Sequence, residues 1–275
     1  MSKGFLTLAQ NGKEDYVKMA YALALSLKLS QSKYNKLSVV VNNDETIPVK
    51  YLEVFDRVFY IDKPDESWKI QNKWQYYNIT PYDETIVLDS DMLFFNDISS
   101  WWSELGIYND IDFTTNISNY KGEVVTSDYY RKVFTNNKLP NLYTGLFYFK
   151  KTKEIKQYFK LVELIFKNWE VFYEKFLKDS PKHLSGDVVY SLAAKIMFNR
   201  KWDSYLSFTH MRSRLQDSTM VDNWNKYLPS FFTKHNGHIG LKVCNYNQTY
   251  PFHYIKKDFM NDEVIELYET TLRLL

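Results

Sequence analysis

Two acidic residues one position apart, Asp89 and Asp91, directly follow residues 85–88, which have the composition of a short buried strand. Such a strand delivers both carboxylates to its carboxyl edge, which is where open α/β sheets bind their ligands. Two neighbouring carboxylates repel each other unless a cation lies between them. A hard divalent metal that also binds phosphate oxygens would supply this cation. The alternative interpretation is a polar turn, in which Asp89 caps the segment that follows.

The elements that must position this pair alternate between strand and helix over residues 1–90. Short runs rich in Leu, Val and Ile indicate strands, and longer runs with apolar residues at helical spacing indicate helices. In chain order, the predicted strands are 4–9, 37–41, 57–61 and 85–88, and the predicted helices are 14–29, 48–55 and 70–78. This alternation predicts βαβ units, and therefore an α/β fold with a mostly parallel central sheet flanked by helices.

The pattern loosens in the second part of the chain. Strands are predicted at 111–115 and 142–149 and helices at 154–176 and 187–197, which gives a single domain with a helical C-terminal part. The last segment, 261–275, is predicted to be an amphipathic helix. We expect its apolar face to pack on its own domain, and the same face would also suit a membrane surface or the interface of a homodimer.

The composition indicates which classes of binding partner and which cellular compartment to expect. The 275 residues carry a net charge of only +2, which gives no basis for a bulk electrostatic partner such as duplex DNA. The single cysteine, Cys244, excludes an intramolecular disulfide and a cysteine-rich zinc site. Because the sequence has no apolar stretch of membrane-spanning length and no signal-peptide core, we expect a cytoplasmic protein. The abundance of Lys, Asn and Tyr fits an AT-rich bacterial or viral genome.

The common glycine-rich nucleotide-binding motifs are missing from the sequence. No Gly-x-Gly-x-x-Gly follows the first predicted strand, and no loop ends in Gly-Lys-Ser/Thr. A nucleotide would therefore need another device, and a metal ion held by Asp89 and Asp91 and shared with a diphosphate is such a device. A phosphatase-type Asp-x-Asp nucleophile would be expected after the first strand, whereas this pair follows the fourth.

Several separate stretches accompany the acidic pair in the order found in a known family. Residues 6–11 look like that family's opening strand and nucleotide loop, 15–27 like its first helix, 55–62 like its next segment, and Asp89-Ser90-Asp91 like its Asp-x-Asp. The chain thus resembles the GT-A-fold glycosyltransferases, in particular the glycogenin and galactosyltransferase-like family 8. The resemblance implies a GT-A domain over 1–258, with a nucleotide-binding half of about 1–98 and a donor-sugar and acceptor half of 99–258, followed by a C-terminal helix at 259–275.

The resemblance also implies contacts to a UDP-sugar donor. Tyr16 matches a tyrosine that stacks on uracil, and its alternative is a core contact of an amphipathic helix. Lys73 falls at the spacing where the family places a lysine near the nucleotide sugar, and its alternative is an exposed helix face. In full, the residues implied to bind the donor are Leu8, Ala9, Asn11, Tyr16, Lys73, Asp89, Ser90, Asp91, Gly145 and Lys257.

The family's third metal ligand is a histidine near the C-terminus. His253, in Pro-Phe-His-Tyr-Ile-Lys-Lys, is the best match, and His238 competes because a glycine and a lysine follow it in the family's order. The resemblance implies that Asp89, Asp91 and this histidine hold Mn²⁺ or Mg²⁺. Lys256 or Lys257 would neutralise the leaving diphosphate.

The resemblance further implies that Asp187, within Gly-Asp-Val, accepts hydrogen bonds from the donor sugar. We take Asp187 and Lys256 as the catalytic candidates, and Asp112 is the other carboxylate of interest. Two positions depart from the family: Tyr143 replaces an asparagine at the sugar, and Val188 replaces a glutamine near the reacting face.

These features predict a metal-dependent glycosyltransferase that moves a hexose from a UDP-sugar to an acceptor, with retention of anomeric configuration implied by the resemblance. The acceptor is a glycan, a protein or a lipid-linked saccharide. One alternative is an inactive carbohydrate- or nucleotide-binding module, which the replacements at Tyr143 and Val188 keep open. Another is a sugar nucleotidyltransferase, which would need a glycine-rich basic loop where this chain has only residues 10–13.

Overall fold

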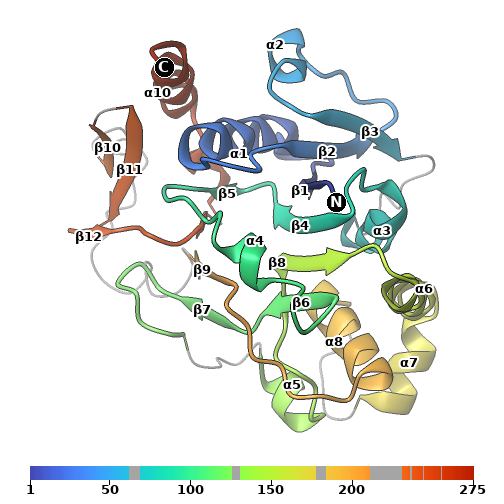
Figure 1. Ribbon diagram of the computed structural model, residues 1–275. Coiled ribbons are helices and arrows are strands. Elements are labelled where there is room, and N and C mark those ends of the chain that lie inside the picture. Colours follow the sequence, from blue (N-terminus) through green and yellow to red (C-terminus); the bar gives the residue numbers. More distant parts are fainter. Residues whose placement is uncertain are drawn as a thin grey trace.

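The structure is a computed structural model that describes residues 1–61, 69–125, 131–177, 184–210, 231–235, 237–243, 245–254 and 256–275 (Figure 1). Cys244, on which the sequence-based statement about disulfides rests, lies outside these residues. Within the described ranges, no helix has both the length and the apolar character needed to cross a membrane.

A six-stranded sheet forms the centre of the molecule, in the order β3-β2-β1-β4-β8-β6. Its strands are β1 (Lys3–Leu8), β2 (Leu37–Asn42), β3 (Arg57–Ile61), β4 (Glu84–Asp89), β6 (Ile111–Thr114) and β8 (Tyr143–Lys150). The first four run parallel, and β8 runs antiparallel to both of its neighbours. The predicted α/β class with a mostly parallel sheet is therefore confirmed. Because β1 and β4 end side by side, Asp89 reaches the carboxyl edge opposite Leu8.

Helices cover both faces of this sheet (Figure 1). Alternate residues of β1 point to opposite faces, so Phe5 joins the core under α1 (Tyr16–Ser30), while Leu6 joins the core under α6 (Lys153–Lys167) and α8 (Gly186–Met197). The start of α1 is fixed by the Asp15 carboxylate, which accepts a hydrogen bond from the backbone N–H of Lys18 at 2.9 Å.

Apart from α10 (Asp262–Arg273), which is described below, the other helices among the described residues are short. They are α2 (Val49–Leu52), η1 (Lys69–Gln75), α3 (Tyr76–Ile79), α4 (Trp101–Glu104), α5 (Lys132–Asn136), α7 (Trp169–Phe176) and η4 (Lys257–Phe259). The long helix predicted at 154–176 is two helices, because Asn168 between α6 and α7 leaves the helical backbone region, with φ −126° and ψ 35°. The helix predicted at 70–78 is also divided into two elements. The 3₁₀ helix η1 leads directly into the short α-helix α3.

Two small sheets that the sequence did not predict accompany the helices of the later part of the chain. One sheet has the order β5-β13-β9-β7 and the other β10-β11-β12. Their strands are β5 (Met92–Leu93), β7 (Asn116–Ser118), β9 (Ser207–His210), β10 (Phe232–His235), β11 (His238–Val243), β12 (Tyr246–Asn247) and β13 (Phe252–His253). Apart from β11, these strands have only two to four residues, and the sequence did not predict them.

The C-terminal helix α10 (Asp262–Arg273) packs on its own domain, as expected. Val264, Ile265 and Tyr268 are buried in the same core as α1. At the rim of this contact, Lys18 Nζ lies 2.6 Å from Asp262 Oδ1. The apolar face that a membrane or a second subunit would need is thus already occupied within the chain.

Candidate active site

The acidic pair and His253 converge because two short strands pair beside the central sheet. Asp89 ends β4, and after the turn through Asp91 the chain enters β5, which pairs antiparallel with β13 so that His253 lies opposite Met92. The backbone N–H of Tyr254 donates to the Asp91 carbonyl at 3.0 Å, which fixes this register. One ligand atom from each of the three side chains lies within 4.8 Å of the other two.

This donor set fits a hard divalent cation. His253 Nε2 lies 3.1 Å from Asp91 Oδ1 and 3.9 Å from Asp89 Oδ2. Octahedral Mg²⁺ keeps its ligands at about 2.1 Å, so adjacent ligand atoms are separated by about 3 Å. The separation of His253 Nε2 and Asp91 Oδ1 matches this spacing, and that of His253 Nε2 and Asp89 Oδ2 is longer.

Of the two histidines left open by the sequence, the structure brings His253 to the acidic pair. His238 lies on β11, opposite His235 in the hairpin formed by β10 and β11, and its side chain is exposed. It does not belong to the group of possible metal ligands found among the described residues.

Two lysines neutralise the carboxylates. Lys73 Nζ lies 2.7 Å from Asp89 Oδ1, and Lys257 Nζ forms an ion pair with Asp91 Oδ2. Burial lowers the pKa of Lys73, but Asp89 outweighs this effect and leaves the pKa above its ordinary value. Burial likewise raises the pKa of Asp91, and His253 and Lys257 reverse the shift, so that this pKa lies well below its usual range.

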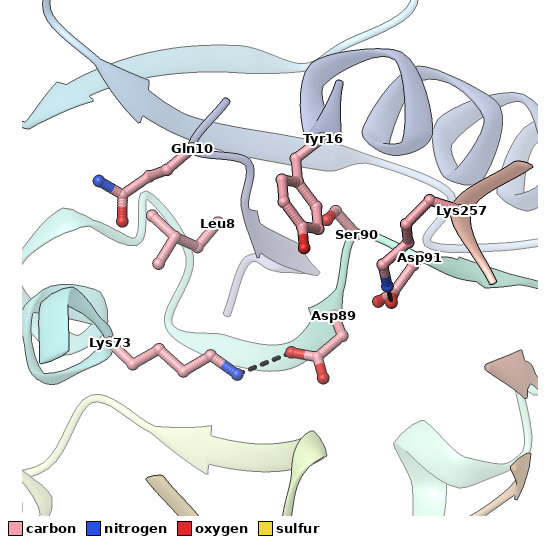
Figure 2. Close-up of a pocket in the computed structure, with 8 residues that line it drawn as sticks. All are labelled: Leu8, Gln10, Tyr16, Lys73, Asp89, Ser90, Asp91 and Lys257. Carbon is pink, nitrogen blue, oxygen red and sulfur yellow. Dashed lines mark hydrogen bonds and ion pairs between the residues drawn. The ribbon is translucent and has the colours of Figure 1, made fainter. Parts of the chain in front are cut away.

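The pair lines a first cavity of about 220 Å³ together with other charged, polar and apolar side chains. In Figure 2, Lys73 and Lys257 approach the two carboxylates from opposite sides. Tyr16 and Leu8 form part of the wall, and Lys257 Nζ lies 5.5 Å from the centre of the Tyr16 ring. Ser90 also lines this cavity, as its place between the two aspartates requires.

The end of β1 contributes Gln10, which sequence reasoning did not single out. Gln10 lines the first cavity, donates to Asn42 Oδ1 at 2.6 Å and accepts from Asn72 Nδ2 at 2.9 Å. The resemblance implied that the adjacent residues Ala9 and Asn11 bind the donor, but neither lines the cavity. Ala9 is fully buried, and the Asn11 side chain accepts a hydrogen bond from the backbone N–H of Val17. Gln10 lies inside the stretch 6–11 that resembles a nucleotide loop, which is the signal that pointed to this region.

A second cavity of about 180 Å³ shares Asp89 and Lys73 with the first. The other residues that line it are Tyr143, Thr144, Gly145, Ser185, Gly186, Asp187, Phe208, His210 and His253. A Cβ atom on Gly145 would lie 3.0 Å from Asp89 Oδ2, so a larger residue there would crowd the carboxylate. Glycine at this position therefore leaves Asp89 open to this cavity.

Asp187 lines the second cavity, and its carboxylate is fixed in place by contacts with Thr144 and Arg131. Its Oδ1 accepts from the backbone N–H and the hydroxyl of Thr144, at 2.9 and 2.7 Å, and its Oδ2 lies 2.7 Å from Arg131 Nη1. The Arg131 guanidinium lies 3.8 Å from the centres of both the Phe134 and Tyr143 rings. No sequence motif surrounds Arg131, so the sequence did not predict this ion pair. The Tyr143 ring is one of the two aromatic rings that pack on the Arg131 guanidinium.

The chain matches no family model, and no curated protein is similar to it in sequence. Among solved structures, it is similar to mouse xyloside xylosyltransferase 1 in its apo form, with 12% identity, 94% of this chain and 99% of that chain covered, and a TM-score of 0.54. It is also similar to an active-site mutant of LgtC, with 10% identity, 99% and 96% coverage and a TM-score of 0.50. The chain has the GT-A glycosyltransferase fold.

The chain also matches part of a longer protein. The glycosyltransferase GlyE of Streptococcus pneumoniae is 11% identical, and the match covers 73% of this chain but only 45% of GlyE, with a TM-score of 0.41. The chain thus spans less than half the length of that protein.

Three further residues, Lys256, Asp112 and His210, differ in their position relative to the two cavities. Lys256 is exposed and lines neither cavity, whereas its neighbour Lys257 lines the first. Asp112 also lines neither, because it is buried beside Ser204, whose hydroxyl donates to it at 2.8 Å. Burial raises the pKa of Asp112 to about 6. His210, which sequence reasoning did not assign to the site, lines the second cavity with its ring 5.1 Å from that of His253.

Proposed function

We propose that this protein is a metal-dependent glycosyltransferase that transfers a hexose from a UDP-sugar to an acceptor. The observation that carries this proposal is the convergence of Asp89, Asp91 and His253 between two lysine side chains, at the carboxyl edge of a GT-A sheet. The resemblance to family 8 adds uridine, the hexose and retention of anomeric configuration.

The three ligand residues would hold Mn²⁺ or Mg²⁺. When bound, this cation acts as a Lewis acid that stabilises negative charge on the departing diphosphate. Lys257 and Lys73 neutralise the carboxylates in the free protein. Once a cation takes over that task, both ammonium groups become available to donate to phosphate oxygens, which hydrogen-bond strongly to charged donors.

The two cavities would divide the donor between them. Tyr16 and Leu8 would supply apolar surface for the base, and Lys257 would supply charge near the acidic pair. The sugar would then lie in the second cavity, where Gly145 leaves room beside Asp89.

Asp187 is suited to accept a hydrogen bond from a sugar hydroxyl. An ionised carboxylate offers about four lone-pair sites. Arg131 and Thr144 occupy three of them with three hydrogen bonds. The remaining site would orient the donor sugar, and the charge of Asp187 stays balanced by Arg131.

The proposal is tested by measuring UDP release from UDP-glucose and UDP-galactose by the purified protein, with Mn²⁺ and with EDTA. We expect release only with Mn²⁺, and its loss in Asp91→Asn. Asp44→Asn is the matched control, because Asp44 is exposed and lines neither cavity. A wild-type protein that releases no UDP in a metal-dependent way, or an Asp91→Asn variant that retains activity, contradicts the proposal.

A binding module without turnover is the second candidate, and one observation favours it. Tyr143 packs its ring on Arg131, and Val188 is only 5% exposed, so neither offers the amide group that family 8 has at these positions. Such a module binds UDP in calorimetry with Mn²⁺ but releases none from UDP-sugars, so the same two measurements distinguish the candidates.

A further inference from the structure

A third cavity, of about 580 Å³, lies apart from the two that form the candidate active site. It is bounded by Thr115 and by Asn116 at the start of β7, by the loop 138–141 before β8, and by Lys195 and residues 199–203 at and beyond the end of α8. It shares no lining residue with the other two cavities. Its volume falls within the range of about 300–1,000 Å³ that is usual for small-molecule sites.

The lining of this cavity is strongly basic. Lys138, Lys195, Arg200 and Lys201 contribute four cationic side chains, against the single carboxylate of Asp203. Within the described part of the chain, the ammonium groups of Lys138 and Lys201 make no ion pair, and both residues are exposed. The whole chain has a net charge of only +2, so this concentration of positive charge is local.

Arg200 adds a guanidinium whose hydrogen-bonding capacity is largely unused. Its Nη2 donates to the Ile111 carbonyl at 3.0 Å, and the group stacks on Trp202 at 4.1 Å from the ring centre. Arg200 Nε and Trp202 Nε1 are both buried without a hydrogen-bond partner among the described residues. Burial lowers the pKa of Arg200, and Asp112 and Glu154 offset only part of the shift. An additional anion nearby would therefore be stabilising.

This basic cavity lies next to the second cavity of the candidate active site. Asn141 lines the basic cavity and accepts a hydrogen bond from Arg131 Nε at 2.8 Å, and Arg131 in turn holds Asp187 in the wall of the second cavity. Tyr143, which also lines the second cavity, follows Asn141 by two residues. Two residues span at most about 7 Å, so the linings of the two cavities come within this distance of each other along the chain.

We infer that the basic cavity binds an anionic group, a carboxylate or a phosphate, carried by the saccharide acceptor. This inference rests on the proposed function, because it assigns the acceptor to the side of the second cavity away from the nucleotide. Lys138 and Lys201 supply mobile point charges, and Arg200 supplies a planar donor group that matches carboxylate and phosphate oxygens.

The test is a calorimetric titration of the full chain with three probes: trigalacturonate, glucose 6-phosphate and neutral maltotriose. We expect at least one anionic probe to bind at least ~10-fold more tightly than maltotriose, which corresponds to one charge-assisted hydrogen bond. The two anionic probes distinguish a carboxylate from a phosphate. Equal binding of charged and neutral probes, or no binding of any, overturns the inference.

A charge-reversed variant locates the site. Lys138→Glu combined with Lys201→Glu is expected to lose at least ~10-fold in affinity for the preferred anionic probe. The matched control is Lys156→Glu combined with Lys160→Glu, two exposed lysines of α6 that do not line the cavity. An equal loss in both variants means non-specific attraction and overturns the assignment.

Titration of UDP with Mn²⁺ in the same variants separates this inference from the proposed function. We expect the charge-reversed variant to bind UDP as the wild type does. If the wild type binds UDP with Mn²⁺ but shows no preference for anionic saccharides, the inference alone fails. If the wild type does not bind UDP at all, the proposed function fails, and the assignment of this cavity to an acceptor fails with it.

Discussion

Asp91 and Asp187 are both paired with cations near the same edge of the central sheet, but the pairs differ in kind. Asp91 contacts Lys257 and His253, and the lysine is a point charge on a flexible stem that can move to a new partner. Asp187 contacts Arg131, whose guanidinium is fixed between two aromatic rings. That guanidinium also donates to the Asn141 side chain and to the Leu142 carbonyl.

This difference separates a ligand site from its scaffold. A bound cation could take the place of Lys257 beside Asp91, and Lys257 could then pair with a phosphate group. Replacing the contacts of Asp187 would release a buried arginine that holds β8 and the start of α8 together. We therefore expect the lysine pairs to control binding and the arginine pair to control stability.

The largest expected effect is on the arginine pair. Arg131→Met leaves the charge of Asp187 without its partner, and breaking a buried pair in this way costs about 3–5 kcal/mol. Urea denaturation should therefore show a loss of this size in the free energy of unfolding, while Mn²⁺ affinity of the folded protein stays within about threefold. A variant as stable as the wild type would show that this ion pair is not structural.

Asp112 provides a third kind of carboxylate, which is buried and forms no ion pair with another described residue. Its pKa of about 6 in the folded protein lies above the ordinary value of 3.8. Below about pH 4 the Asp112 carboxyl group is protonated in both the folded and the unfolded state. Its contribution to the free energy of unfolding is therefore fully present there, and this contribution is lost as the pH rises through 6. The shift corresponds to at most about 3 kcal/mol.

We expect Asp112→Asn to lack this loss, because an asparagine can keep the contacts with Ser204 and the backbone N–H of Phe113. The free energy of unfolding of the variant, relative to the wild type, should therefore rise between about pH 4 and about pH 7. A constant difference across this range would mean that Asp112 titrates near its ordinary pKa.

The next largest effect is expected for substitution of a metal ligand. His253→Ala removes one of three protein ligands, and we expect Mn²⁺ affinity to fall at least ~100-fold, since even residues that only support ligands account for about 10–100-fold. The measurement is a direct titration of Mn²⁺ followed by electron paramagnetic resonance. His238→Ala is the matched control, because His238 is exposed on the β11 hairpin. Equal affinities for the two variants would remove His253 from the site.

The smallest expected effect concerns the lysines at the phosphate. Lys257→Met should weaken UDP binding by ~10-fold in the presence of Mn²⁺, as expected for the loss of one charged hydrogen bond. Lys256→Met, one position away on an exposed side chain, should bind UDP as the wild type does. If Lys256→Met has the larger effect, the two lysines exchange roles.

The sequence was most informative where the site depends on a strand end. Asp89 and Asp91 follow a strand whose apolar pattern is clear, so that pattern alone predicts their place at the sheet edge. His253 lies on the two-residue strand β13, which has no periodic pattern of its own, and only the family resemblance selected it over His238. The pairing of β13 with β5 supplies the physical reason.

Arg131 and the basic cavity could not be predicted from the sequence. The partners of Arg131 lie at Asn141, Leu142 and Asp187, so its role depends on tertiary contacts between distant segments. The lysines and arginine of the basic cavity are likewise drawn from separate loops and the end of α8, and each one alone has the appearance of an ordinary surface residue.

The most direct test of the account is a crystal structure of the full chain with Mn²⁺ and UDP, in which anomalous scattering locates the metal. We expect Mn²⁺ between His253 and the two aspartates of the acidic pair, with Lys257 Nζ moved from Asp91 to a phosphate oxygen. Arg131 should keep its contact with Asp187. Mn²⁺ bound elsewhere, or Lys257 still paired with Asp91 in a site filled with UDP, would contradict the account.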